Sequence, residues 1–174
     1  MSENNLQERV YEMLKQQQQD WDLAEKNYRG LQKVKKRFVR LGEGVEVGVQ
    51  FNPERIYSSA AKVDDKSISR RKCFLCRAHL PEQQTWVEFE SEYLILVNPF
   101  PIFPLHLTIP IVDHKEQRIG GRMTDMLKLA RVLKDFVVFY NGPRCGASAP
   151  DHFHFQAGNK GFMPVEDDAE RLTK

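Results

Sequence analysis

The segment His152-Phe153-His154-Phe155-Gln156 alternates polar and aromatic residues, and this alternation constrains the fold more than any other feature of the chain. Side chains along a β-strand point alternately to the two faces of a sheet. As a strand, the segment places His152, His154 and Gln156 on one face and the two phenylalanines in the core. We therefore predict a strand with one apolar face and one face that carries two imidazoles and an amide.

Patterns of apolar residues predict the other elements. Residues 6–34 carry apolar side chains mostly at helical spacing, and Gln16 to Gln19 leave open whether they form one long helix or two short ones. Alternation with a period of two on both sides of Gly42-Glu43-Gly44 predicts a β-hairpin. Residues 57–71 show no periodicity and predict a surface loop. We expect further strands at residues 86–89, 93–97, 105–109 and 136–140, and a helix at residues 123–134.

These elements predict an α+β fold class, with one antiparallel sheet, a long N-terminal helix and one helix packed on the sheet. The length of 174 residues suits one compact domain. We expect residues 1–34 to form an N-terminal helical segment that packs on the sheet or on a partner chain. Residues 35–174 then form the domain that carries the histidine strand.

Charge and hydropathy limit the classes of partner. The 26 Lys and Arg residues nearly balance the 24 Asp and Glu residues, which argues against a large basic surface for nucleic acid. No apolar run approaches the roughly 20 residues that cross a bilayer, and the first residues do not resemble a secretory signal. We therefore expect a cytoplasmic protein that has no membrane partner and binds its anionic ligands in a local site.

Two of the three cysteines, Cys73 and Cys76, form a C-x-x-C motif. Zinc prefers four tetrahedral cysteine or histidine ligands, so this pair needs two further ligands from elsewhere in the chain. His79 follows closely enough to reach the same ion. Free core thiols and a redox pair are the alternatives to a zinc site. Cys145 stands alone, and we expect it to be a small core or loop residue.

A loop that contains glycine precedes the predicted histidine strand. A neutral imidazole can attack phosphorus and form a covalent intermediate, which divides a difficult displacement into two easier steps. Gly142 and Gly146 allow close approach of the backbone to an anion, and Ser148 and Gln156 can donate hydrogen bonds to phosphoryl oxygens. Asn141 is placed to brace the loop. For an isolated His-x-His motif, the alternative is one buried and one exposed histidine without a catalytic role.

The residues from Asn141 to Gln156, Asn-Gly-Pro-Arg-Cys-Gly-Ala-Ser-Ala-Pro-Asp-His-Phe-His-Phe-Gln, resemble a signature of the histidine-triad (HIT-like) superfamily. The similarity is to the branch of galactose-1-phosphate uridylyltransferase, dinucleoside-tetraphosphate phosphorylase and GDP-L-galactose phosphorylase. The continuation into Met163-Pro164-Val165-Glu166 is most similar to the phosphorylases. The resemblance covers residues 45–166 and includes Gln50-x-Asn52-x-x-Arg55, Asn98-Pro99-Phe100-Pro101 and Pro104-Leu-His106-Leu-Thr-Ile-Pro110-x-x-x-His114.

The resemblance implies roles for individual residues. His154 is the implied nucleophile that becomes nucleotidylated, with His152 beside it, and Gln156 is the residue that holds the α-phosphate. Asn98 is expected near the ribose hydroxyls. The residues implied to bind the nucleotide are Asn98, Asn141, Gly146, Ser148 and Gln156, and those implied to hold a structural zinc ion are Cys73, Cys76, His114 and His152.

Glutamine at the third position of the motif, where the hydrolase branches carry histidine, implies transfer to a phosphate or sugar-phosphate acceptor rather than to water. The expected function is a nucleotidyltransferase or phosphorylase that acts on a nucleotide sugar or dinucleoside polyphosphate through a covalent nucleotidyl-histidine. The loop at residues 141–148 is one residue shorter than in uridylyltransferases, and Phe155 replaces their glycine; both argue against that activity. Because the chain ends 18 residues after Gln156, we expect a truncated chain or a pocket completed by a partner, and we favour a homodimer.

Two other functions remain open: a HIT-type nucleotide hydrolase, and a non-catalytic zinc-stabilised module that binds nucleotides or nucleic acid. His106 is more typical of a structural hydrogen-bonding residue than of one that approaches substrate. Phe51, Phe100 and Ile102 are candidates for the wall around the base. A nucleic-acid-binding module would use the basic residues Lys33, Lys35, Lys36, Arg37, Arg70, Arg71 and Lys72.

Overall fold

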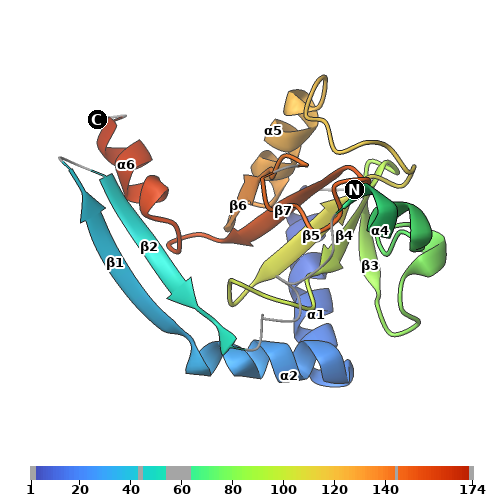
Figure 1. Cartoon of the computed structure of the whole chain (residues 1–174), viewed down its shortest axis with the longest axis horizontal. Helices are drawn as coiled ribbons and strands as arrows, with labels where there is room; N and C mark the ends of the chain where they lie inside the picture. Colours follow the sequence, from blue (N-terminus) through green and yellow to red (C-terminus); the bar gives the residue numbers. More distant parts are fainter. Residues whose placement is uncertain (1–2, 43–44, 54–63, 144, 173–174) are drawn as a thin grey trace.

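The computed structural model describes residues 3–42, 45–53, 64–143 and 145–172, and its centre is a five-stranded antiparallel sheet (Figure 1). The strand order is β3-β4-β5-β7-β6. This sheet and the helices packed on it confirm the predicted α+β fold class. The five strands are β3 (Trp86–Phe89), β4 (Tyr93–Val97), β5 (His106–Pro110), β6 (Phe136–Phe139) and β7 (His154–Asn159).

Two helices, α1 (Glu3–Asp20) and α2 (Asp22–Gly30), make up the N-terminal segment. The break falls at Trp21, whose backbone is extended (φ −113°, ψ 102°), and not at the glutamine run. Helix α1 packs on β3 and β4, so the segment covers the sheet of its own chain. No helix in the described residues combines the length and hydropathy needed to cross a membrane. The buried apolar residues of α1 are Leu6, Val10, Met13 and Leu14.

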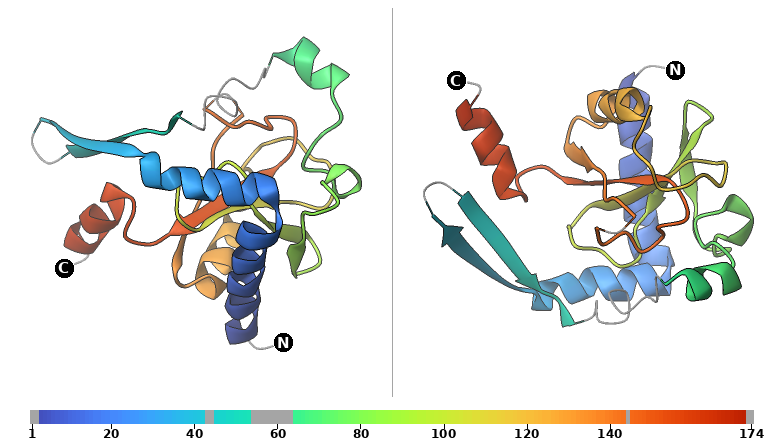
Figure 2. Two further views of the ribbon diagram at one scale, coloured as in Figure 1. Left: turned by 90° about the horizontal axis from the view of Figure 1, so that it is seen from below. Right: turned by 45° about the horizontal axis from the view of Figure 1, so that its top comes forward.

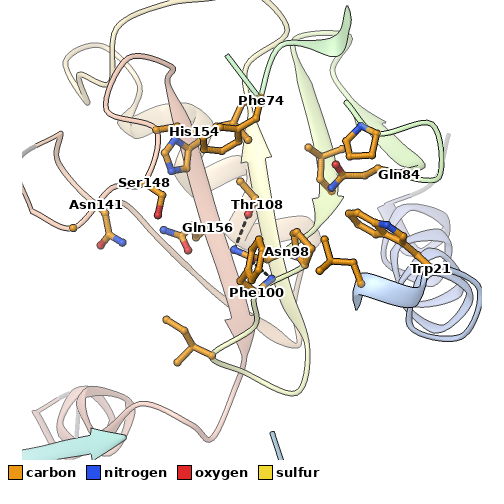
Figure 3. A pocket seen from close by; sticks show the side chains of 18 residues that line it. Trp21, Phe74, Gln84, Asn98, Phe100, Thr108, Asn141, Ser148, His154 and Gln156 are labelled. Carbon is orange, nitrogen blue, oxygen red and sulfur yellow. Dashed lines mark hydrogen bonds between the residues drawn. The ribbon is translucent and has the colours of Figure 1, made fainter. Parts of the chain in front are cut away.

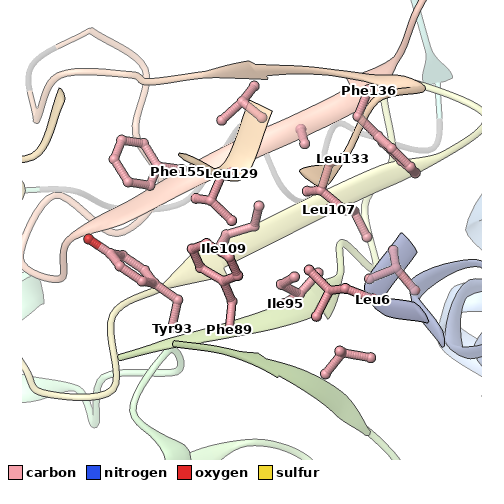
Figure 4. Packing of buried hydrophobic residues seen from close by; sticks show 14 of the residues in the cluster. Leu6, Phe89, Tyr93, Ile95, Leu107, Ile109, Leu129, Leu133, Phe136 and Phe155 are labelled. Atoms are coloured by element: carbon pink, nitrogen blue, oxygen red, sulfur yellow. The ribbon is translucent and has the colours of Figure 1, made fainter. Parts of the chain in front are cut away.

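Helices α1 and α5 (Met123–Val132) contact each other and cover one face of the sheet (Figure 2). The core lies between these helices and the sheet (Figure 4). Phe153 and Phe155 belong to this core and are 2% and 0% exposed, which confirms the apolar side predicted from the alternation. The opposite face of the central strands is therefore free to carry polar side chains.

A two-stranded arm, β1 (Lys35–Leu41) and β2 (Val45–Phe51), projects from the sheet and confirms the predicted hairpin (Figures 1 and 2). Its turn residues 43 and 44 lie outside the described part of the chain. One face of the arm lies next to the start of α6 (Pro164–Leu172), where the Lys36 ammonium lies 3.6 Å from the centre of the Phe162 ring. The other face is exposed and carries Val39, Leu41, Val45, Val47, Val49 and Phe51.

The structure differs from the predicted elements in several places. A short helix, α4 (Asp65–Arg70), lies within the predicted loop at residues 57–71 and is capped by Asp64, which accepts a hydrogen bond from Ser67 N at 3.0 Å. Six residues are too few to show a helical period, and residues 57–63 lie outside the described residues. Strand β7 begins at His154, so His152 precedes the strand instead of belonging to it. Helix α6 and the short 3-10 helix Arg77–His79 had no predicted counterpart, whereas the 3-10 helix Leu31–Lys33 lies at the end of the predicted helical segment.

Gly158 on β7 lies against the ring of Phe103. A Cβ atom at residue 158 would lie 2.7 Å from Phe103 Cγ. The Phe103 ring is buried between Phe139 and Phe162 and has little room to move. We expect Gly158→Ala to lower the free energy of unfolding by about 1–3 kcal/mol in urea denaturation, because the core becomes overpacked.

Gly120→Ala is the matched control, since no heavy atom lies within 4 Å of a Cβ at that exposed position. We expect it to change the free energy of unfolding by less than about 0.5 kcal/mol. Equal stability of the two variants would contradict the packing argument.

Candidate active site

A cavity of about 560 Å³ lies on the sheet face opposite α1 and α5. Strands β5 and β7 form its floor, because Thr108 and Gln156 are paired in the register of the sheet. Its polar lining includes Asn98, Thr108, Asn141, Ser148, His154 and Gln156, and its apolar lining includes Trp21, Phe74, Leu75, Leu96, Phe100 and Ile102 (Figure 3). The structure thus brings together the predicted nucleophile and all five residues predicted to bind the nucleotide, since Gly146 also lines the cavity.

The imidazole of His154 has a fixed orientation. Its Nδ1 lies 2.8 Å from the backbone carbonyl oxygen of His152. A carbonyl oxygen only accepts, so Nδ1 carries the proton and Nε2 keeps its lone pair. Burial lowers the pKa of His154 below its ordinary value, which favours the neutral ring. His154 therefore presents a neutral, nucleophilic nitrogen in a cavity on the sheet.

The amide of Gln156 is also oriented by a neighbour. The Nδ1 atom of His106 accepts a hydrogen bond from Ile102 N at 3.1 Å, so the ring proton resides on Nε2. His106 Nε2 then donates to Gln156 Oε1 at 3.0 Å. This contact leaves the NH₂ group of Gln156 as the end that can donate to a ligand. His106 is fully buried and does not line the cavity, in agreement with the structural interpretation of this residue.

The loop after β6 supplies Asn141, Gly146 and Ser148 to the cavity. Gly146 has a φ of +89°, a backbone conformation that side chains with a Cβ rarely adopt. Across the cavity floor, Asn98 Nδ2 donates to Thr108 Oγ1 at 3.0 Å, and Asn98 Oδ1 accepts from Phe100 N at 2.9 Å. Both ends of the Asn98 amide are therefore held in place.

Gln117 is a site residue that the sequence reasoning missed. Its side chain is fully buried, donates to the backbone carbonyls of Asn141 and His154 at 2.8 and 3.0 Å, and accepts from His154 N at 2.7 Å. Thr108, Trp21 and Gln84 were also missed as lining residues. Gln117, Trp21 and Gln84 do not stand in a recognisable motif, because their relation to His154 exists only in the folded chain. Thr108 alone had a usable signal, since it lies in the quoted segment 104–110 and on the polar side of a predicted strand.

Four potential metal ligands meet beside the cavity. The ligand atoms of Cys73, Cys76, His114 and His152 all lie within 4.8 Å of one another. His152 Nε2 lies 2.7 Å from the Ile111 carbonyl, so it donates there and Nδ1 keeps its lone pair, 3.2 Å from Cys73 Sγ. The Cys76 sulfur lies 3.2 Å from His114 Nδ1. These separations fit four donors around one ion, so the cluster is able to bind a metal.

The protonation of the two cysteines depends on whether a cation is bound between them. Burial and the neighbouring Cys73 thiol raise the pKa of Cys76 to about 11. Two thiolates side by side therefore require a positive charge between them. His79 is not part of the four-residue group; its Nδ1 lies 2.9 Å from the Cys73 carbonyl oxygen.

The remaining predicted residues lie at different distances from the cavity. Phe100 and Ile102 line it, whereas Phe51 is exposed on the arm. Cys145 is exposed in the loop after β6. Arg71 pairs with Asp151 at 2.8 Å rather than lining the cavity, and Arg55 lies outside the described residues. The basic residues of the alternative nucleic-acid surface are divided between the arm and the region around α4.

The chain is similar in sequence to one curated yeast enzyme. It is 33% identical over 94 residues to diadenosine 5',5'''-P1,P4-tetraphosphate phosphorylase 2 of Saccharomyces cerevisiae, a match that covers 45% of this chain and 29% of the yeast protein. The crystal structure of yeast Ap4A phosphorylase Apa2 in complex with Ap4A matches with a TM-score of 0.63 and 20% identity. That match covers 97% of this chain and 56% of the yeast chain.

The structure of the same yeast enzyme in complex with AMP matches with a TM-score of 0.56 and 22% identity, over 97% of this chain and 54% of that chain. The chain thus spans about half the length of these solved relatives. The sequence match covers less, 29% of the curated yeast protein. These similarities confirm the resemblance to dinucleoside-tetraphosphate phosphorylases. Residues 13–159 match the family described as a domain of unknown function, DUF4922, and the chain therefore belongs to the DUF4922 family.

Proposed function

We propose that this chain carries the nucleotidyl-transfer site of a dinucleoside-polyphosphate phosphorylase. The observation that supports this proposal most directly is the orientation of His154, whose protonated Nδ1 is held by a carbonyl and whose neutral Nε2 is left for the cavity. The similarity to a yeast phosphorylase solved with Ap4A and with AMP supports a nucleotide substrate.

In the proposed reaction, His154 Nε2 forms a bond to the α-phosphorus of the substrate. The bond from this phosphorus to the bridging oxygen breaks, and the leaving polyphosphate keeps the electron pair. An oxygen of inorganic phosphate then attacks the same phosphorus. The phosphorus–nitrogen bond breaks, and its electron pair returns to Nε2. The proton stays on Nδ1 throughout and keeps its hydrogen bond to the His152 carbonyl, so the imidazole keeps its orientation.

The residues around His154 would stabilise the charge that develops on the phosphoryl oxygens. The Gln156 NH₂ group and the Ser148 hydroxyl are the proposed hydrogen-bond donors. Asn141 and the backbone at Gly146 would bind the remaining phosphate oxygens, and Asn98 would lie near the ribose. A nucleotide sugar as substrate requires the same chemistry at the α-phosphorus and is the second candidate.

A covalent intermediate would be detected by intact-protein mass. After incubation with Ap4A in the absence of phosphate, we expect wild-type protein to gain the mass of one adenylyl group (AMP less one water), and His154→Ala to gain none. His79→Gln is the control, because that histidine is exposed and lies outside the cavity lining. An adduct on His154→Ala would contradict the assignment of the nucleophile.

The acceptor is tested with the same protein. Addition of inorganic phosphate should discharge the adduct and release ADP, whereas a hydrolase would release AMP at the same rate with or without phosphate. Discharge by water alone would favour the hydrolase.

We further propose that the Cys73, Cys76, His114 and His152 cluster holds a structural zinc ion. The two-sulfur, two-nitrogen donor set is one that zinc prefers, and a closed set of four protein ligands is typical of structural rather than catalytic zinc. The ion would neutralise the thiolates and tie the loop before β3 to the residue that precedes β7. Its part in the reaction would be to fix His152, whose carbonyl holds the imidazole of His154.

Removal of one ligand should release the metal. We expect Cys76→Ser to lower the zinc content from about one ion per chain to well below one, measured by mass spectrometry of the metal, and to lower the melting temperature. His79→Gln, which removes the local alternative ligand, should retain the ion, because His79 lies outside the four-residue group. Loss of zinc in His79→Gln with retention in His114→Gln would overturn the proposed ligand set.

A further inference from the structure

The cavity has two ends of different chemistry. His154, Ser148 and Asn141 lie at one end, whereas Trp21 and Gln84 lie at the other, with the Asn98 region between them (Figure 3). If the α-phosphate binds at His154, the opposite end is where the base of the nucleotide must lie. The indole of Trp21 offers this end a flat aromatic surface, on which a base can pack.

Gln84 is held firmly at the base end. It is 7% exposed, and its backbone N–H donates to the Pro81 carbonyl at 2.9 Å. The neighbouring carbonyl of Gln83 accepts a hydrogen bond of 2.6 Å from Gln17 Nε2 on α1. The side chain of Gln84 reaches the end of β4, where Nε2 donates to the Val97 carbonyl at 3.0 Å. Its position is thus determined by the turn, by α1 and by the sheet.

The contact with Val97 also determines which end of the amide is available. A backbone carbonyl only accepts, so the Gln84 NH₂ group must face it and the amide cannot be reversed. Oε1 is then the polar atom left for a ligand, and no donor pairs with it among the described residues. The base end of the cavity therefore offers a fixed hydrogen-bond acceptor.

We propose that Gln84 is a specificity-determining residue that selects adenine by accepting a hydrogen bond from its 6-amino group; this inference rests on the proposed function. Hypoxanthine has the same shape but carries a carbonyl oxygen at position 6. Two acceptors would then face each other in a buried site, and neither would find a donor. Sites that hydrogen-bond one group strongly reject the analogue that lacks it, because buried polar groups are left unpaired.

The test compares AMP with IMP by calorimetric titration of the full chain. We expect wild-type protein to bind AMP about tenfold to hundredfold more tightly than IMP. Gln84→Met, which retains the length of the side chain and removes the acceptor, should weaken AMP binding to the level of IMP and leave IMP binding nearly unchanged. If the role of Gln84 were purely structural, the substitution would instead weaken the binding of AMP and of IMP equally.

Gln83→Met is the matched control, because the exposed neighbour contributes its backbone carbonyl and not its side chain. It should retain the preference for AMP. Equal affinity of wild-type protein for AMP and IMP would overturn the role of Gln84, even if Gln84→Met fails to fold. If the AMP adduct still forms in that case, the proposed function stands without this specificity. Absence of both nucleotide binding and adduct would overturn the two proposals together.

Discussion

The three hydrogen bonds of the Gln117 amide are the interaction on which the site depends. Strand β6 pairs with β7 as far as Phe139 and Gln156, and the chain then turns away into the loop that begins at Asn141. The backbone of His154 would be left unpaired at this point, inside the protein, which is costly for buried polar groups. Gln117 replaces the missing strand, because it pairs with both the N–H and the carbonyl of His154. The loop is therefore free to leave the sheet while His154 stays in register.

His152 connects the cluster of four potential metal ligands to this arrangement. Its side chain faces the two cysteines, and its backbone carbonyl holds the imidazole of His154. His106 performs the corresponding task for the Gln156 amide. The two groups nearest the proposed reaction are thus oriented by buried hydrogen-bond partners that need not touch the substrate. Such preorganisation reduces the rearrangement required when charge develops on the phosphoryl group.

The sequence predicted those parts of the site that depend on local alternation or on a motif. The polar and apolar sides of β7 follow from the order of residues around His154, and Cys73 and Cys76 are recognisable from their spacing. The roles of Gln117 and Gln84 could not be predicted, because a single glutamine belongs to no periodic pattern. The role of its side chain depends on which backbone carbonyls the fold places beside it. The helix break at Trp21 was also hidden, because the glutamine run before it is the more obvious irregularity while Trp21 itself fits the apolar pattern.

Trp21 belongs both to the break between α1 and α2 and to the wall of the cavity. Helix α2 is further attached to the cavity through Asn27, which donates to the Pro99 carbonyl at 2.7 Å, and through Tyr28, which donates to the His106 carbonyl at 3.1 Å. Docking of the N-terminal helices and occupation of the cavity are therefore linked equilibria. If docking of the helices strengthens the binding of a ligand that packs on Trp21, the bound ligand must stabilise the docked helices in return. The two free energies are equal. The first thirty residues would thus contribute to the affinity for such a ligand as well as to the core.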